Sequence, residues 1–137
     1  MRPRKAHLAF LDLARVVRVA TADARGAPHV VPVCAVVIDR RVYFASGATG
    51  RKVRNIRANP QVALVADDYT EAWAGLRGVM LVGSARLHDR GPVFRRAQRR
   101  LYAKYPPYES EAALEEGDAV VVEVTPAAVF AWGFPHG

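Results

Sequence analysis

The segment from Ser46 to Asn55, Ser-Gly-Ala-Thr-Gly-Arg-Lys-Val-Arg-Asn, has the residue types that bind an oxyanion. Its small residues leave backbone N–H groups accessible, and a helix that begins behind them brings partial positive charge. Arg51, Lys52 and Arg54 add fixed cations. Cations at a helix start oppose the helix dipole, and a bound anion would compensate for that. A phosphate or carboxylate site and a plain surface helix with solvated arginines explain these residues equally well.

This segment is not a phosphate-binding loop of the nucleotide-hydrolase type. Its glycines have the wrong spacing for that motif. In addition, Val53 follows the lysine, where the motif needs a serine or threonine to hold magnesium. The segment therefore does not predict a bound magnesium nucleotide, and an anion site of another kind and a plain surface helix both stay open.

The other residue types that could do chemistry form no constellation. The four histidines and the single cysteine, Cys34, lack metal-ligand spacing, so we expect no metal. No serine lies in a nucleophile-elbow context, and Cys34 lies in an apolar run where a buried thiol is the default. An enzyme with this inventory would have to take its chemistry from a cofactor.

Length and charge narrow the class of protein. The chain has 137 residues, of which 51% are hydrophobic, and this predicts a single domain. Its formal charge of +7 predicts an anionic partner. All but three of the basic residues are arginines, the exceptions being Lys5, Lys52 and Lys104. A body of this size encloses a cleft with difficulty, so we expect homo-oligomerisation. No apolar run reaches the ~20 residues that cross a bilayer and no export signal is recognisable, so we expect a cytoplasmic protein without a membrane partner.

A second group of cations lies at Arg95, Arg96, Arg99 and Arg100, on one face of a predicted helix over 92–104. No aromatic residues alternate with these arginines, although stacking on aromatic rings is typical of single-strand binding. We therefore interpret them as a solvated face and do not expect nucleic acid as a partner.

The elements that must position the Ser46–Asn55 segment are mostly strands. Hydrophobic periodicity predicts helices over 5–14, 51–59 and 92–104, with Thr49 as cap of the second and a short turn over 110–115. It predicts strands over 16–21, 28–38, 42–45, 62–66, 79–87, 120–124 and 129–132. The first three strands read as an antiparallel meander, and Gly83 indicates a bulge or a close approach. The pattern predicts an antiparallel barrel with helices at its edges.

The order of these motifs resembles a known family. The motifs are Pro28-His-Val-Val-Pro-Val33, Val42-Tyr-Phe-Ala-Ser46, Lys52-Val-Arg-Asn-Ile56, Asn59-Pro-Gln-Val-Ala63 and the strand that contains Gly83. They resemble the pyridoxamine-phosphate-oxidase-like split β-barrel proteins, and among these the actinobacterial flavin/deazaflavin oxidoreductases that use coenzyme F420. The resemblance implies a single, mainly β, split-barrel domain over 1–137.

The resemblance also implies a function and a site. It implies a homodimer with cofactor sites at the subunit interface and hydride transfer between reduced F420 and a small organic substrate. Lys52, Arg54, Asn55 and Arg51 would hold the phosphate or the acidic tail of the cofactor. Backbone of Pro32-Val33 and Ala45-Ser46 would flank its ring system.

The substrate pocket is the least specified part of the resemblance. Tyr69 and Trp73, in the loop over 67–75, are the candidates to line it. Arg77-Gly78 stands where bulkier residues are expected, which suggests a more open pocket. The substrate itself is not indicated.

Three alternatives remain open at the level of sequence. The first is an FMN-dependent oxidase or reductase of the same fold. The second is a barrel that carries haem or flavin without turnover. The third is a barrel that binds single-stranded nucleic acid. The long polyanionic tail of F420 suits a protein of charge +7 better than the single phosphate of FMN does.

Overall fold

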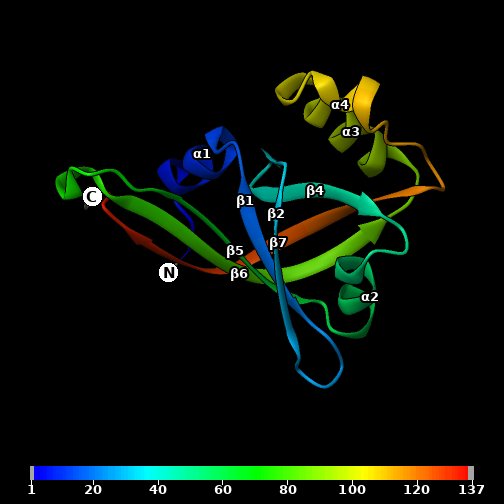
Figure 1. Cartoon of the computed structure of the whole chain (residues 1–137), viewed down its shortest axis with the longest axis horizontal. Coiled ribbons are helices and arrows are strands. Elements are labelled where there is room, and N and C mark those ends of the chain that lie inside the picture. Colours follow the sequence, from blue (N-terminus) through cyan, green and yellow to red (C-terminus); the bar gives the residue numbers. More distant parts are fainter. Residues whose placement is uncertain (1, 136–137) are drawn as a thin grey trace.

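The computed structural model describes residues 2–135 and contains one seven-stranded sheet with helices at its edges (Figure 1). The strands are β1 (Val17–Ala22), β2 (Pro28–Val33), β3 (Ala35–Ile38), β4 (Arg41–Gly47), β5 (Gln61–Asp68), β6 (Arg77–His88) and β7 (Ala119–Trp132). The helices are α1 (Lys5–Leu13), α2 (Arg51–Ala58), η1 (Trp73–Gly75), α3 (Pro92–Lys104) and α4 (Pro107–Glu111). The mainly β fold class is thereby confirmed, and the short turn predicted over 110–115 begins earlier, at Pro107.

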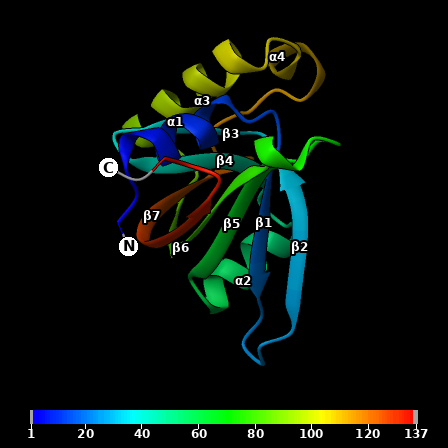
Figure 2. The ribbon, with the colours of Figure 1, turned by 90° about the vertical axis from the view of Figure 1, so that its left-hand side faces the viewer.

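The sheet curls into a partly closed barrel because its two edge strands follow each other in the chain. The strand order is β2-β1-β5-β6-β7-β4-β3, and all pairs are antiparallel. β2 and β3 therefore lie at opposite edges although only Cys34 separates them. Figure 2 shows β2 rising along one side before the chain turns across the top into β3 and β4.

The single strand predicted over 28–38 is wrong. Both antiparallel pairings expected of the meander form, but they lie at opposite edges of the sheet and not side by side. β2 pairs with β1, in the register Val33↔Val17, whereas β3 pairs with β4, in the register Ala35↔Phe44. Hydrophobic periodicity detects that both halves are extended, but the residues that break the strand lie far away in the sequence. We call the point around Cys34 where the chain leaves one edge for the other the fork.

Two side chains at the end of α3 hold the backbone at the fork. Lys104 donates from Nζ to the carbonyl oxygens of Ala35 (2.6 Å) and Ala14 (2.8 Å). The hydroxyl of Tyr105 accepts from the N–H of Ala35 (3.2 Å) and donates to the carbonyl oxygen of Arg15 (2.9 Å). These bonds satisfy backbone groups that a continuous ladder would otherwise pair.

The hydrophobic core has two parts. The larger lies inside the curled sheet and includes Val19, Phe44, Leu64, Leu81 and Val122. The smaller lies on the other face of β3, β4 and β7, where α3 covers the sheet. The residues that α3 buries there are Phe94, Ala97 and Leu101.

The opposite face of α3 carries the arginines, and most of them are neutralised. Arg96 pairs with Asp39 (2.6 Å), Arg95 with Glu116 (3.2 Å) and Arg100 with Asp12 (3.7 Å). All three guanidinium groups remain about half exposed. The predicted helix over 92–104 is thus confirmed, and its basic face is solvated and paired with acids of the same chain.

β7 is one long strand rather than the two that were predicted on either side of Thr125-Pro126. Its register with β6 shifts between Val82 and Gly83, from Val82↔Ala128 to Gly83↔Pro126. This bulge accommodates Pro126, which has no N–H to give to the ladder. A Cβ at residue 83 would collide with the carbonyl oxygen of Thr125. The bulge and close approach predicted at Gly83 are both confirmed.

Replacing Gly83 should therefore destabilise the fold. We expect Gly83→Ala to lower the free energy of unfolding by about 1–3 kcal/mol, because the added methyl group has to push β7 away. Urea denaturation at neutral pH measures this loss. Gly75→Ala is the control, because a Cβ there meets nothing within 4 Å. Equal stability of both variants would contradict the close approach.

Candidate functional site

The sheet splits beside the fork, and four residues expected around a ring system border the split. The ladder between β3 and β4 ends at Ala35↔Phe44, so Ala45 and Ser46 continue along β4 beyond it. On the other side Pro32 and Val33 have turned away to pair with Arg18 and Val17 of β1. The two backbone segments therefore diverge from a common point. Each has an edge that no neighbouring strand of the sheet covers, and such edges offer free N–H and C=O groups.

The loop after β4 leads directly into α2. A tight turn, in which Gly50 N–H donates to Gly47 carbonyl oxygen (3.1 Å), makes Gly50 rather than Thr49 the N-cap. Neither residue supplies a side-chain cap, and α2 has no acidic residue in its first turn. The predicted capping by Thr49 is therefore wrong, because the turn moves the helix start one residue along. The first N–H groups of α2 have no side-chain oxygen to bind.

The cations of α2 have no acidic partners, in contrast to those of α3. Within residues 2–135, no ion pair or hydrogen bond engages the charged groups of Lys52, Arg54 or Arg57. Arg51 influences Asp23 in the turn between β1 and β2. The pKa of Asp23 is lowered mainly by the N–H groups of Ala27 and Arg25, and only slightly by Arg51. The helix thus presents positive charge that the described chain leaves uncompensated.

Asn55 lies on the buried face of α2, which packs against the barrel, and not on the face that carries the cations. Its side chain is only 4% exposed, and Nδ2 donates to Oγ1 of Thr21 on β1 (3.0 Å). Val53 and Ile56 flank it on the same buried face of the helix. This bond fixes α2 against the barrel, and so Asn55 determines where the neighbouring cations stand.

A shallow cavity of about 400 Å³ lies next to the Ser46–Thr49 loop. Tyr108 and Leu114 form its opposite wall. Burial raises the pKa of Tyr108 to about 12, so its hydroxyl stays protonated at neutral pH. Sequence reasoning missed Tyr108, Lys104 and Tyr105. The signals that could have found them are the rarity of lysine and the run Tyr-Pro-Pro-Tyr after the predicted helix over 92–104.

Tyr69 and Trp73 are not near α2 in one chain. They are 60% and 80% exposed at the tip of the β5–β6 arm, which projects away from the body (Figure 1). β5 begins just after α2 and ends at Asp68, which spans about 23 Å at 3.3 Å per residue. A single chain therefore does not bring the two aromatic residues to the cations of α2.

The space over Gly78 is filled, whereas Arg77 lines a cavity of about 420 Å³ together with Phe10. The ring of Trp132 packs over Gly78 so closely that a Cβ there would collide with it. The Arg77 guanidinium lies 4.9 Å from the ring centre of Phe10 and 5.9 Å from that of Phe134, and it pairs with Asp68 (3.8 Å). The openness expected at Arg77-Gly78 is therefore absent over Gly78, where Trp132 of β7 fills the space, and present beside Arg77.

The outer face of the sheet is apolar and accessible. Strand register aligns two rows across β2, β1, β5, β6 and β7. The rows are Pro32, Arg18, Val65, Met80, Phe130 and Val30, Ala20, Ala63, Val82, Ala128. Val30 and Phe130 are each 63% exposed, and Arg18 pairs with Asp67 (3.7 Å).

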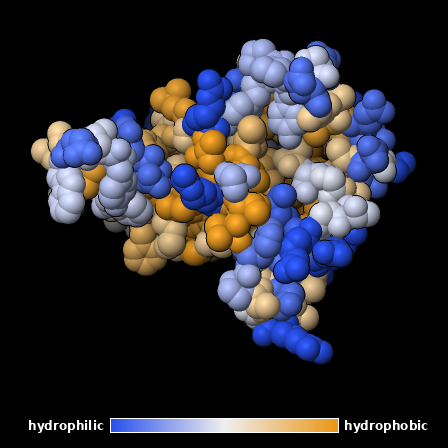
Figure 3. Space-filling view, in the orientation of Figure 1, coloured by the Kyte–Doolittle hydropathy of each residue, from blue (hydrophilic) through white to orange (hydrophobic). Residues whose placement is uncertain are grey.

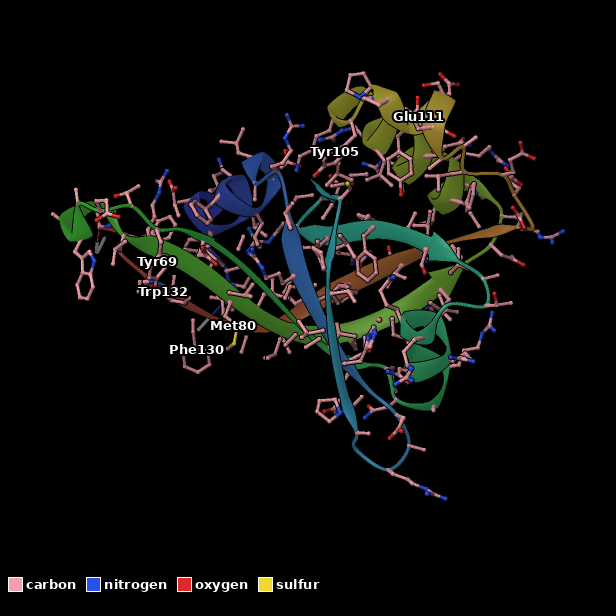
Figure 4. All side chains as sticks on the ribbon, viewed as in Figure 1. Tyr69, Met80, Tyr105, Glu111, Phe130 and Trp132 are labelled. Carbon is pink, nitrogen blue, oxygen red and sulfur yellow. The ribbon has the colours of Figure 1, made fainter. Side chains whose placement is uncertain are left out.

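The pictures agree with this description of the outer face. Figure 3 shows hydrophobic residues gathered where β1, β2 and β5 cross in Figure 1. Figure 4 shows Met80, Phe130, Trp132 and Tyr69 on the same side of the arm. An apolar surface that crosses five strands is typical of a protein–protein contact.

Two further properties limit the kind of site. Among residues 2–135 no group of three or more histidine, cysteine or acidic side chains could hold a metal ion. In the same part of the chain, no helix has the length and apolar character needed to traverse a bilayer.

Comparison with known proteins identifies relatives of the whole chain. A model of the pyridoxamine 5′-phosphate oxidase family matches residues 3–133. Among curated proteins none matches the sequence.

Three solved structures are similar over nearly their full length. A conserved hypothetical protein from Mycobacterium tuberculosis has a TM-score of 0.80 at 22% identity, covering 98% of this chain and 91% of that one. HutZ, a haem storage protein from Vibrio cholerae, has a TM-score of 0.78 at 17% identity, covering 95% and 94%. An F420 reductase has a TM-score of 0.74 at 22% identity, covering 93% and 98%. At these identities the likeness establishes the fold.

The anchoring of α2 by Asn55 gives a test. We expect Thr21→Val to lower the free energy of unfolding by about 1–3 kcal/mol, because it leaves the buried amide of Asn55 without its partner. Chemical denaturation measures the change. Thr49→Val is the matched control and should stay within about 0.5 kcal/mol of the parent, because exposed Thr49 caps nothing. The reverse ranking would restore Thr49 as the cap.

Proposed function

Because the chain belongs to the pyridoxamine 5′-phosphate oxidase family, we propose that it is an oxidoreductase that uses coenzyme F420 and acts on a small organic substrate. The observation that carries the proposal is the uncompensated positive charge of α2 beside the split in the sheet. When bound, the deazaflavin would supply the hydride chemistry that the side chains of this protein lack. FMN is the alternative cofactor.

The phosphate and acidic tail of the cofactor would lie along the start of α2. Arg51, Lys52 and Arg54 would contact the anion, together with the first N–H groups of the helix. Asn55 would act as a positioning residue through its bond to Thr21. No described acid forms an ion pair with Lys52 or Arg54, so an anion at these two cations would meet little competition.

The ring system would lie in the split, between the backbone of Pro32-Val33 and that of Ala45-Ser46. The edges of both segments offer hydrogen-bonding groups that no adjacent strand of the sheet uses. The protein would orient the ring and exclude water, which are the contributions that hydride transfer requires of it. Tyr108, held protonated by burial, lies across a cavity from Ser46 on the same side of the molecule.

We further propose that the protein is a homodimer with shared sites. A second copy would cover the apolar outer face. Removing this face from water would stabilise the dimer. The β5–β6 arm of each copy would then extend across the interface. Tyr69 and Trp73 of one copy would then line a substrate pocket at the split of the other. The single free cysteine is consistent with the cytoplasm as its compartment.

A second function is haem binding without turnover. It is favoured by the haem storage protein among the structures that share the fold. This candidate uses the same barrel but does not need the cations of α2 for a long anionic tail.

The cofactor can be tested by direct titration. We expect F420 to bind with a change in deazaflavin fluorescence, FMN to bind more weakly, and haemin to give no defined Soret band. Lys52→Ala/Arg54→Ala should weaken F420 binding by at least about tenfold, because each charge-assisted phosphate contact contributes about 1.5–3 kcal/mol. Arg95→Ala/Arg99→Ala removes the same charge from α3 and should leave binding within about twofold. Tight FMN binding without F420 binding, or a haem spectrum, would move the assignment to the corresponding alternative.

The shared site can be tested by a charge on the outer face. We expect Val30→Asp to convert the dimer into a folded monomer, because the carboxylate would be buried without a partner at the interface. Light scattering after size exclusion measures the mass, and the same titration should show F420 binding lost with the dimer. Ala103→Asp, on exposed α3, should remain dimeric. A Val30→Asp dimer, or a monomer that binds F420 normally, would contradict the shared site.

A further inference from the structure

A second basic cavity lies at the other end of β4 from α2. It has a volume of about 500 Å³ and is formed by the N-terminal segment, the turn between β3 and β4, and the bulged part of β7. Three arginines line it, Arg2, Arg40 and Arg41, together with Thr125. β4 runs from Arg41 at this cavity to Gly47 at the α2 loop, about 20 Å away at 3.3 Å per residue. The cavity is therefore separate from the proposed cofactor site of the same chain.

Two of the three guanidinium groups are held in place. Nη2 of Arg40 donates to the carbonyl oxygen of Pro3 (2.6 Å), which ties the N-terminal segment to the turn. Nη1 of Arg41 lies 3.7 Å from Oε2 of Glu123. Groups held by second contacts lose less freedom when a ligand binds.

Glu123 is itself firmly fixed, so it is a dependable anchor for Arg41. It is 6% exposed, accepts a hydrogen bond from the Tyr43 hydroxyl (2.8 Å) and bonds to Nε2 of His88 (3.1 Å). Burial alone would raise the pKa of Glu123, but these bonds and the Arg41 charge outweigh it and lower the pKa. The carboxylate is thus ionised at neutral pH and is already occupied by its partners.

Asp39 is the one acid among the described residues that line the cavity, and Arg96, which lies outside the cavity lining, neutralises it. Asp39 accepts a hydrogen bond from Nη2 of Arg96 on α3 (2.6 Å), and Arg96 is not a lining residue. The remaining charge that faces the cavity is positive. An oxyanion that enters would meet guanidinium groups suited to bind it in pairs.

The backbone of the turn is unusual for its sequence. Asp39 and Arg40 have φ of 49° and 68°, the left-handed region that glycine and asparagine prefer. Asp39 and Arg40 are the two central residues of the hairpin that pairs Ile38 with Arg41, and a hairpin turn of this kind requires φ > 0 at both positions. Here the conformation turns Arg40 back toward Pro3, at the cavity.

We propose that this cavity is a second anion-binding site, which takes a compact multivalent oxyanion with phosphate or carboxylate groups. Its volume lies in the range of small-molecule sites. Its described lining contains no aromatic ring on which a base could stack, so the charged groups and not a nucleoside would be recognised. The site needs neither the cofactor nor the dimer of the preceding subsection.

The test uses tripolyphosphate and citrate as probes and the Lys52→Ala/Arg54→Ala variant as the parent, so that binding at α2 is weakened and the signals of the cavity residues report on the cavity itself. Two-dimensional amide NMR follows the signals of residues 39–41, Thr125 and Ala127 during titration at constant ionic strength. We expect these signals to shift and saturate. A response to tripolyphosphate alone would identify phosphate as the ligand chemistry, and a response to citrate alone would identify carboxylate.

Arg40→Gly is the decisive variant because it removes the guanidinium while giving the left-handed position the residue that it favours. We expect it to remain folded and to weaken binding at least about tenfold, and Arg2→Ala to weaken it further. Arg96→Ala should also weaken binding, because it leaves Asp39 unneutralised inside the cavity. Arg99→Ala, on the same helix, is the control. Absence of saturable shifts in the parent, or undiminished binding by Arg40→Gly, would overturn the proposal.

Discussion

The backbone of Ala35, held by Lys104 and Tyr105, is the constraint on which the rest of this structure depends. Its N–H is bound by the hydroxyl of Tyr105 and its carbonyl oxygen by Nζ of Lys104, at the end of α3. The chain can therefore leave the β1 edge and join the β4 edge within one residue. The sheet curls into a barrel because of that change of partner, and the split beside it leaves two backbone edges free. The change of strand partner at the fork thus produces both the closure of the fold and the split that we propose for the cofactor ring.

Positive charge has three different roles in this protein, and neighbouring acids decide between them. On α3 the arginines are paired with Asp12, Asp39 and Glu116, which leaves them as a solvated face. On α2 the cations have no described acidic partner, so they remain able to bind an anion. At the β3–β4 turn, Arg96 neutralises Asp39 and buried Glu123 anchors Arg41, so a basic cavity is built from charges of both signs. A net charge of +7 describes none of these arrangements by itself.

The small size of the chain explains both its exposed apolar face and the fact that one chain does not complete the proposed substrate pocket. One chain forms the split and the α2 loop but carries Tyr69 and Trp73 on an arm that points away from them. It also exposes two apolar rows across five strands. A second copy would cover those rows and bring an arm to each split. A body too small to enclose a cleft would in this way build one from two chains.

The sequence by itself determined the elements with strong local signals. The helix over 92–104, the bulge at Gly83 and the family motifs from Pro28 onward all follow from periodicity, glycine and residue order, which act over a few neighbouring residues. Only the tertiary structure decided that 28–38 breaks at Cys34, that 119–132 is one strand, and that Asn55 is buried against Thr21. It also decided which arginines are paired. Each of these outcomes depends on a partner that is distant in the sequence, and local patterns carry no information about such partners.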